Sequence, residues 1–477
     1  MLVTLLCAPD APASSVLETI GAPGTGNGFT ARLLSRGADV AYFNPSLLAD
    51  ASPTLSFGVL LLGNFSRIHL ARRTAGVDVP DSVYDADLVR APANGIEFWP
   101  QATSNLLNQR TNTVSNEATP YVAMGFLRPL VNDHRLVFGF YALIPATGFL
   151  QQDSFFADER EQYFSNKLHF ELLGDRLRVP TIAASLGGRI FESLSWGAGV
   201  DIGMATRTQM QVYIPNAGDQ RTLLMVPKID TTIAASPFFG ISWRPHARAF
   251  VTATLHTPKS WDTSGENRLR FWDYTYPSGE TAVAQTYTLT QGAEPLRLGL
   301  GVATNGKLGA TVWQLGLEGV WTAWSKYRDR HGERPEDTWH NTVNLGVGWV
   351  LERARHRFMA ELGVAPSPVP DQTGRTNYVD NTRWGTSMGV EVPFSYLQTD
   401  YALGIHLQGQ FMFPRSMQKQ ADAHSPVRDE LPDAAVDRLR GNPLSGAAGL
   451  QTNNPGYPGY TSYGLMLGAA VVLKVLR

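Results

Sequence analysis

YALGIHLQGQFMF, residues 401–413, alternates between apolar and polar or small side chains along its length. Because successive side chains of a β-strand point to opposite faces, one face would carry mostly large apolar residues, namely Tyr401, Leu403, Ile405, Leu407, Phe411 and Phe413. The other face would carry small or polar residues, namely Ala402, Gly404, His406, Gln408 and Gln410. The stretch therefore predicts a two-faced β-strand.

The same alternation returns in VWQLGLEGVWTAW (312–324), TVNLGVGWVL (342–351) and SYGLMLGAAVVLKV (462–475). A soluble β-sandwich also alternates in this way and is the alternative. Two features oppose it. The apolar faces extend over about 17–24 Å, more than a usual strand of ~5–6 residues, and the weaker face holds mainly Gly, Ala, Gln, Asn and Thr instead of Lys and Glu. Segments of this length that are apolar outside and polar inside are typical of an outer-membrane β-barrel.

The spacing of the strands gives a second, independent signal. The gaps between predicted strands alternate between long and short, as expected for long extracellular loops and short periplasmic turns. The alternation predicts an all-β, 14-stranded antiparallel transmembrane β-barrel with strands near 54–65, 118–127, 135–145, 179–191, 195–212, 224–244, 247–257, 285–304, 308–324, 341–351, 355–365, 384–396, 400–413 and 462–475.

The residues that precede the first strand form a separate region. We interpret residues 1–20 as a residual signal or leader segment, with a structured N-terminus or a lipid anchor at Cys7 as alternatives. Residues 21–52 are rich in Gly and Ala but also carry large apolar side chains, which a solvated tail would not need. We therefore expect 21–52 to be an N-terminal hatch that plugs the lumen, and 53–477 to be the barrel.

Composition excludes several classes of function. A net charge of −2 gives no basic surface for nucleic acid. Charged residues make up 17% of the chain, below the roughly 25% of soluble domains. The ten His and one Cys show no metal-ligand spacing, so neither a metal nor a cofactor is expected. GTSMG (385–389) matches a nucleophile motif, but Ser387 falls within an alternating strand instead of the strand–turn–helix elbow that this chemistry needs. We expect a protein that is not an enzyme.

Three motifs resemble the FadL-type long-chain fatty acid and hydrocarbon transporters of Gram-negative outer membranes. GADVAYFNPSLLA (37–49) is similar to the family's hatch motif, with Ser46 in place of the usual Ala. VWTAWSKYRD (320–329) resembles a Trp-Ser pair that closes a strand at the extracellular rim. GVAPSPVPDQTGRTNYVDNTRWGTSMG (363–389) resembles a Ser-Pro-Val-Pro turn followed by an Asp-x-x-Arg loop. The chain departs from the family in ending with VVLKVLR and not with Phe.

The resemblance implies a monomeric barrel in the cell outer membrane, surrounded by outer-membrane lipids. It implies passive transport of hydrophobic small molecules, long-chain fatty acids or related hydrocarbons, past a ligand-gated hatch, with release into the membrane. The hatch motif corresponds to Phe43, Asn44, Pro45 and Ser46. Asp380 and Arg383 would anchor a loop to the rim, by resemblance and by charge pairing.

The residues themselves suggest where a ligand would bind. Tyr141 and Leu143 fall on the inward face of an unusually apolar strand, and Arg189 and Arg297 are the inward cations that could hold a carboxylate. Alternatively these two arginines pair with inward carboxylates such as Asp201, Glu318, Glu361 or Glu391. The alternative function is a structural or adhesive barrel protein without transport, followed by a general porin and a barrel-embedded lipase.

Overall fold

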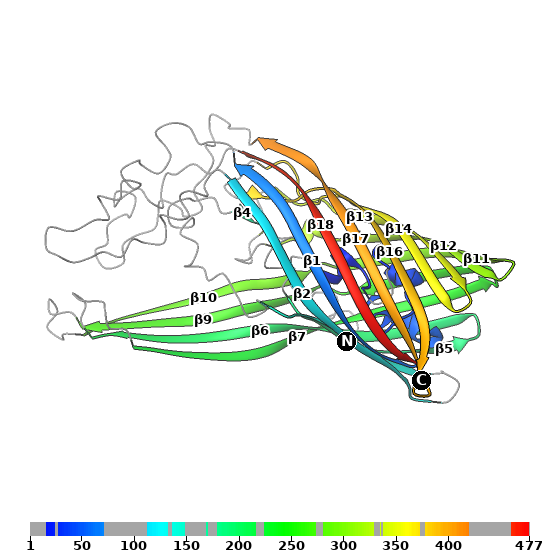
Figure 1. Cartoon of the computed structure of the whole chain (residues 1–477). Helices are drawn as coiled ribbons and strands as arrows, with labels where there is room; N and C mark the ends of the chain where they lie inside the picture. The colour runs from blue at the N-terminus through cyan, green and yellow to red at the C-terminus, as the bar shows by residue number, and fades with distance from the viewer. Residues whose placement is uncertain are drawn as a thin grey trace.

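The computed structural model describes twelve parts of the chain, which are residues 16–23, 27–70, 112–131, 136–147, 168–169, 179–215, 224–272, 280–328, 334, 337–372, 377–418 and 459–476. Within these residues no helix is long and apolar enough to span a membrane. The three helices labelled α are short, and strands make up most of the described chain (Figure 1).

Fourteen antiparallel strands close into a barrel. Neighbours in sequence pair around the ring, and β18 pairs with β1 to close it. Its members are β1 (Thr54–Leu70), β2 (Asn112–Pro129), β3 (Val137–Pro145), β5 (Thr181–Phe191), β6 (Leu194–Ile214), β7 (Leu224–His246), β8 (Ala249–His256), β11 (Arg297–Leu308), β12 (Thr311–Thr322), β13 (Thr342–Arg353), β14 (His356–Ala365), β16 (Arg383–Tyr396), β17 (Thr399–Gln418) and β18 (Gly459–Leu476). The predicted all-β, 14-stranded antiparallel barrel is confirmed.

One predicted strand and one predicted loop are wrong. The expected strand 285–304 is divided between β10 (Glu280–Glu294) and β11, and the expected loop 258–284 contains β9 (Lys259–Trp272). β9 and β10 form an antiparallel hairpin outside the ring. Residues Ser264 to Phe271 of β9 pair in parallel with β6. This pairing lies beyond Ile202 of β6, the residue at which the pairing between β5 and β6 stops. The hairpin therefore covers a backbone edge of β6 that β5 leaves open (Figure 1).

Tight turns lie at one end of the barrel, which we call the short-turn end. The turns after β13 and β16 have two residues each, and Ala354, Arg355, Leu397 and Gln398 all have positive φ. Two successive positive φ values are those of the type I′ turn, whose twist suits a two-residue hairpin. The opposite end, called the long-loop end, carries the longer connections, as the sequence predicted.

The two faces of the wall are the predicted ones. The residues expected to face outward are exposed on the barrel surface, and they are Leu345, Val347, Leu403, Ile405, Leu407, Leu465, Leu467 and Val471. Asp201, Glu318 and Gln408, expected to face inward, are buried. An apolar outer band with a polar interior is the architecture of transmembrane β-barrels.

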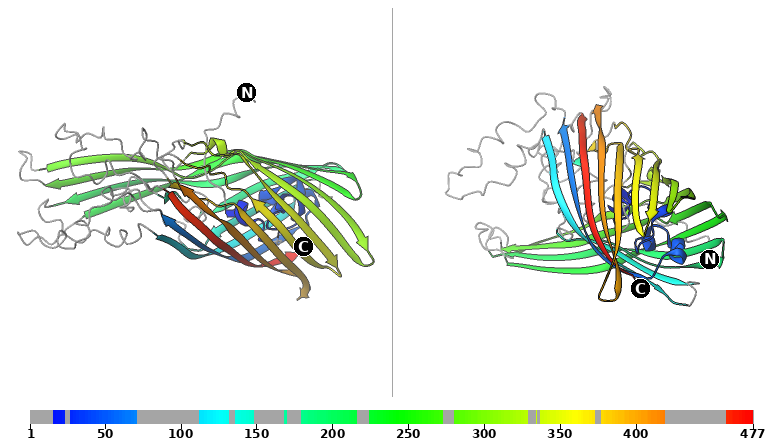
Figure 2. Two further views of the ribbon diagram at one scale, coloured as in Figure 1. Left: turned by 90° about the horizontal axis from the view of Figure 1, so that it is seen from above. Right: turned by 45° about the vertical axis from the view of Figure 1, so that its right-hand side comes forward.

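The N-terminal segment, which we define as the described residues between 16 and 52, packs against the inner side of the wall. It contains α1 (Val16–Ile20), α2 (Ala31–Leu34), α3 (Val40–Phe43) and the 3-10 helix η2 (Pro45–Asp50). These short helices lie beside β5, β6 and β7 on one side and β8, β11 and β12 on another. Both views in Figure 2 place them among the strands. Nearly all of their side chains are buried.

The outward position of Leu407, near the middle of β17, leads to a stability prediction. Leu407→Arg places a charge in the apolar band and should lower barrel stability in a bilayer by about 2–4 kcal/mol. Leu308→Arg, at the turn end of β11, should cost only ~0–1 kcal/mol, because the cost falls toward the interface. Urea unfolding in lipid vesicles measures both values. Equal stability of the Leu407 variant and the unmodified protein would contradict the assigned membrane face.

Candidate functional site

The Asn44-Pro45-Ser46 turn is organised by the Asn44 side chain. Asn44 has extended backbone angles, φ −157° and ψ 96°, so α3 ends there and η2 begins with Pro45. This is the conformation expected before a proline. The Asn44 carboxamide accepts from the Ser46 backbone N–H at 3.2 Å and from the Ser46 hydroxyl at 2.6 Å. It also donates to the Arg32 carbonyl at 2.8 Å, which joins the turn to α2.

Ser46 connects the same turn to the wall. Its hydroxyl forms a hydrogen bond with the Ser242 hydroxyl of β7, and both residues are buried. This contact gives a physical reason for a serine at the position where the FadL-type motif usually has Ala. An Ala could not make either hydroxyl contact.

Pro45 sits against three glycines of three adjacent strands. A Cβ added to Gly187 of β5 or Gly197 of β6 would overlap the Pro45 backbone, and one added to Gly240 of β7 would overlap the Asn44 side chain. We call these residues the Pro45 seat. Since every other amino acid has a Cβ, only glycine lets the turn approach the wall this closely.

Phe29 has a similar seat on the other side of the barrel. Added Cβ atoms at Gly346 of β13, Gly363 of β14 and Gly385 of β16 would each overlap Phe29. We call these residues the Phe29 seat. Both sets point inward from neighbouring strands, so the small residues of the weaker strand face make room for the N-terminal segment.

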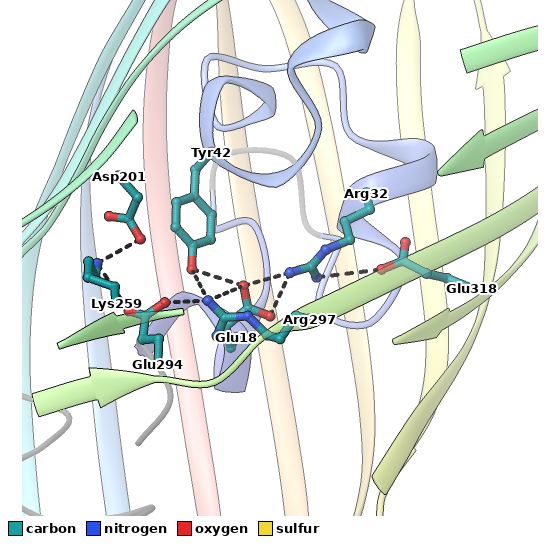
Figure 3. A network of polar contacts seen from close by, with 8 residues as sticks. All are labelled: Glu18, Arg32, Tyr42, Asp201, Lys259, Glu294, Arg297 and Glu318. Atoms are coloured by element: carbon teal, nitrogen blue, oxygen red, sulfur yellow. Dashed lines mark hydrogen bonds and ion pairs between the residues drawn. The ribbon is translucent and has the colours of Figure 1, made fainter. Parts of the chain in front are cut away.

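A chain of buried charged groups joins the N-terminal segment to the wall (Figure 3). Arg32 of α2 holds both carboxylate oxygens of Glu18, at 2.6 and 2.8 Å, and approaches Glu318 of β12 at 3.8 Å. The Tyr42 hydroxyl donates to Glu18 at 2.9 Å. Arg297 of β11 lies 3.7 Å from the same carboxylate.

The chain continues to the base of the β9–β10 hairpin. Arg297 forms an ion pair with Glu294, the last residue of β10. Glu294 also lies 3.4 Å from Lys259, the first residue of β9, which pairs with Asp201 of β6 at 2.7 Å. Because the chain enters and leaves the hairpin at these residues, the same charges tie the hairpin, the wall and the N-terminal segment together (Figure 3).

The pKa of Glu18 shows which of its interactions dominates. Burial by itself favours the neutral carboxyl and would raise the pKa. The guanidinium groups of Arg297 and Arg32 outweigh burial and hold the Glu18 pKa well below its usual range. Glu18 is therefore an anion when the segment is packed against the wall.

Glu361 of β14 is a second attachment point, and its partners are neutral. Its carboxylate accepts from Asn27 at 2.8 Å, from the Phe29 backbone N–H at 2.7 Å and from the Thr30 hydroxyl. The Ser387 hydroxyl of β16 donates to it at 3.2 Å. Ser387 thus lies within a strand, as the alternation predicted, and supports a structural contact.

A recess of about 520 Å3, counting the space through which it opens to solvent, lies between the N-terminal segment and the wall. Strand residues near the long-loop ends of β12, β13, β14 and β16 border it, so it lies on that side of the segment. Its apolar lining includes Leu17, Phe29, Phe43, Val320 and Val364, and its polar lining includes Glu18, Arg32, Glu318, Arg383 and Gln410.

The predicted ligand-binding residues do not come together in one place. Tyr141 and Leu143 point inward but belong to one buried apolar cluster with the N-terminal segment. Arg189, near the short-turn end, pairs with Asp50 at 2.7 Å. Arg297 is part of the charge chain. Both arginines are therefore paired with carboxylates, although not with the four that the sequence suggested, and their role toward a ligand stays a prediction.

The loop before β16 is held by residues that the sequence reasoning missed. Arg415 donates to the Pro370 carbonyl at 2.8 Å and to the Asp380 carbonyl at 3.2 Å. Asn381 donates to the Phe413 carbonyl at 2.8 Å. Asp380 and Arg383 affect each other through charge, and burial raises the pKa of Asp380 to about 6 despite the nearby Arg383. No direct ion pair between these two is seen, so their anchoring role stays a prediction.

Under the loop lies an aromatic cluster. The rings of Tyr327 and Trp339 stack with centroids 3.6 Å apart, and Tyr378 meets both edge-on. Tyr378 belongs to β15 (Asn377–Tyr378), which pairs with β4 (Leu168–His169) in a separate two-stranded sheet. Trp324, in the short 3-10 helix η5 (Trp324–Lys326), completes the cluster. Hydrophobic packing therefore stabilises this part of the rim.

Fold and site together define a closed, 14-stranded barrel of the transmembrane type whose interior contacts an N-terminal segment. The crystal structure of a Pseudomonas aeruginosa FadL homologue matches it with a TM-score of 0.56 and 13% identity, covering 98% of each chain. The chain therefore has the FadL-type fold.

Two further solved structures are similar. The toluene transporter TodX of P. putida aligns with a TM-score of 0.48 and 10% identity, over 95% of this chain and 99% of that chain. The CymD monoaromatic hydrocarbon channel aligns with a TM-score of 0.46 and 11% identity, over 98% of both chains. No protein-family model matches the sequence. No curated protein matches it either.

The Pro45 seat yields a test of how the segment is held. Gly187→Ala should push the Asn44-Pro45 turn from the wall, because overpacking of this kind costs about 1–3 kcal/mol. Labelling of a cysteine placed at Ala49, in a Cys7→Ser background, should then become faster. Gly468→Ala is the matched control, since its added Cβ would be 3.6 Å from the nearest atom. Equal labelling rates in both variants would contradict the proposed seat.

Glu18 yields a pH prediction. Its folded pKa lies below the ordinary value of 4.5, so its ionised form stabilises the segment above about that pH, and this contribution is lost as the pH falls below it. Labelling of the cysteine at position 49, divided by the labelling rate of an exposed reference cysteine at the same pH, should therefore rise on acidification below about pH 4.5. Glu18→Gln should accelerate it already at neutral pH, since removing one partner of a buried pair costs ~3–5 kcal/mol. A variant with unchanged labelling at both pH values would refute the role of Glu18.

Proposed function

We propose that the protein is a passive transporter of hydrophobic small molecules in the outer membrane, working as a monomer surrounded by lipid. The observation that carries this proposal is the apolar and polar recess between the N-terminal segment and the long-loop side of the barrel. The FadL-type fold supports it, as does the transport of toluene and monoaromatic hydrocarbons named for the similar TodX and CymD structures.

In this proposal the N-terminal segment is the hatch. It contacts the wall at the Pro45 seat and the Phe29 seat. These are van der Waals contacts, so the segment and the wall can separate there without breaking a covalent bond. Its polar contacts with the wall are all non-covalent, and they include Glu18 with Arg297, Arg32 with Glu318, Arg36 with Glu352, Asp50 with Arg189 and Arg244, the Asn27–Thr30 turn on Glu361, and Ser46 on Ser242. A hatch that must move and return requires contacts of this reversible kind.

We also propose that the hatch begins earlier than residue 21. Val16, Leu17 and Ile20 of α1 are buried in the same cluster as Tyr42 and Phe43. Glu18 of the same helix contacts Arg32, Arg297 and Tyr42 in the charge chain. A leader segment destined for removal would not need these contacts, so the leader proper would end before Val16, in residues that lie outside the described chain.

The apolar strand around Tyr141 supports a hydrophobic route past the hatch. Tyr141 and Leu143 face α3 and η2 from β3, so movement of the hatch would uncover them toward the lumen. The Tyr141 hydroxyl is buried without a hydrogen-bond partner among the described residues. A general porin, by contrast, needs a wide aqueous lumen, which the packing of the N-terminal segment disfavours.

Replacing the rigid turn tests the gating role. The double variant Asn44→Gly, Pro45→Gly removes the side chain that organises the turn and the ring that restricts it. The barrel should still fold, because its strands do not depend on either residue. Uptake of labelled toluene and of a labelled long-chain fatty acid, at equal outer-membrane abundance, should change severalfold for at least one of them.

Two results would favour the alternative of a structural or adhesive barrel protein. One is uptake of both substrates at background level in cells that depend on the unmodified protein. The other is uptake that is identical in the double variant and in the unmodified protein. Heat-modifiable mobility on a gel shows whether each barrel is folded, and Gly468→Ala serves as the folded control.

A further inference from the structure

We propose that three neighbouring hairpins at the short-turn end form a binding site for the head group of an anionic phospholipid. These hairpins are β7–β8, β11–β12 and β13–β14, which follow one another around the ring because β8 pairs with β11 and β12 pairs with β13. Since the short turns of such barrels face the periplasm, the lipid would belong to the periplasmic leaflet. The inference rests on the outer-membrane location in the proposed function and adds a lipid site to it.

The three hairpins carry exposed cations that form no ion pair with a carboxylate of the described residues. Other cations at the same end are neutralised, since Arg244 pairs with Asp50. Arg36 pairs with Glu352 in the same way. The cations without such a partner in the described chain, which we call the basic arc, are Arg248, Lys307, Arg353 and Arg355. Positive charge therefore gathers on this sector of the rim.

A row of outward-facing residues lies next to the basic arc, one step further along the wall. It runs in register from Gly306 of β11 through Trp313 of β12 and Leu351 of β13 to Phe358 of β14. The Trp313 ring covers Gly306, where an added Cβ would be 2.6 Å from the ring, and Phe358 is 49% exposed. Aromatic side chains at strand ends are typical of the membrane–water interface. The basic arc therefore lies at the depth of the lipid head groups.

Arg353 points outward from the end of β13. Val347 and Trp349 of the same strand are 44% and 52% exposed on the outer face. Because the side chains of a strand alternate, Arg353 has the same orientation as these two residues. Arg355 lies in the two-residue turn that follows, with a φ of 67°. A guanidinium binds phosphate oxygens through two parallel hydrogen bonds, so two guanidinium groups at this depth suit a phospholipid head group.

A lipid matches this surface better than a soluble anion does. Leu308, the last residue of β11, is 78% exposed beside the basic arc. Arg and Lys side chains at the edge of an apolar band keep their stems among acyl chains and extend their charges to the head groups. A phospholipid would therefore contact both kinds of side chain, whereas a soluble anion would use the cations alone. The excess of positive charge favours a head group with a net negative charge over a zwitterionic one.

The test compares two lipids that share their acyl chains. Palmitoyl-oleoyl phosphatidylglycerol and palmitoyl-oleoyl phosphatidylcholine are titrated against the delipidated full-length protein in a non-ionic detergent, and native mass spectrometry measures each dissociation constant. The unmodified protein should bind phosphatidylglycerol more tightly, by about fivefold for each cation that contacts the head group. Arg353→Gln and Arg355→Gln should each reduce this preference about fivefold. Raising the ammonium acetate concentration to about 0.5 M should reduce it in the unmodified protein, because salt screens exposed charges.

Two control variants and one soluble competitor make the comparison specific. Arg128→Gln removes an exposed cation of β2 at the same end but outside the basic arc, and it should leave the preference unchanged. Gln398→Asn changes the matching position of the β16–β17 turn, where φ is also positive, and should have no effect either. Glycerol 3-phosphate has the phosphate without acyl chains. At equal concentration it should not displace phosphatidylglycerol, because it cannot contact the apolar row.

Three results would overturn the lipid site. They are equal affinity for both lipids in the unmodified protein, a preference that survives in the Arg353→Gln, Arg355→Gln double variant, and displacement by glycerol 3-phosphate, which would assign a site for free phosphate. Toluene uptake by cells separates this site from the proposed function. Uptake without a lipid preference leaves transport standing, and a lipid preference without uptake leaves only the lipid site. Should the double variant not fold, Arg355→Gln alone, in an exposed turn, decides the question.

Discussion

The fit between the N-terminal segment and the wall depends on one steric constraint, which is that backbone and ring atoms approach strand backbones at distances that no Cβ permits. At the Pro45 seat the neighbours are Gly187, Gly197 and Gly240, and at the Phe29 seat they are Gly346, Gly363 and Gly385. Each set comes from three adjacent strands. The interior face of the barrel is therefore sterically complementary to this segment. The polar contacts add to a position that steric fit already defines.

The charged groups inside the barrel link separate elements through ion pairs. Burying a charge is costly unless it is paired, and an excellent geometry is needed to repay that cost. In this protein the pairs do not cluster within one element but run from Asp201 of β6 through the base of the hairpin to Arg297, Glu18, Arg32 and Glu318. Each carboxylate or cation has its partner on another element. Moving the segment would therefore separate opposite charges, so this chain of charged groups holds the segment in place.

Much of the fold could be predicted because a strand repeats every two residues. A register that is wrong by one residue would reverse both faces. The strict alternation in stretches such as 401–413 therefore left little doubt about which side chains face inward and which face outward. The β9–β10 hairpin was missed for the same reason. Its residues Lys259–Trp272 mix Thr, Asp, Glu and Arg without a continuous apolar face, because this hairpin lies outside the closed ring and has no apolar band to complete.

The sequence by itself determined the barrel, its fourteen strands, the orientation of their faces, and the turn at Asn44-Pro45, since these follow from local periodicity and from the geometry of proline. The tertiary structure alone decided which buried polar side chains interact with one another. Arg297 meets Glu18 and Glu294, Glu361 meets Asn27 and Thr30, and Ser46 meets Ser242. Most of these groups are hundreds of residues apart in the chain, and closure of the ring brings them together. Strand periodicity indicates that a side chain points inward. Its interaction partners depend on the closed ring and on the N-terminal segment inside it.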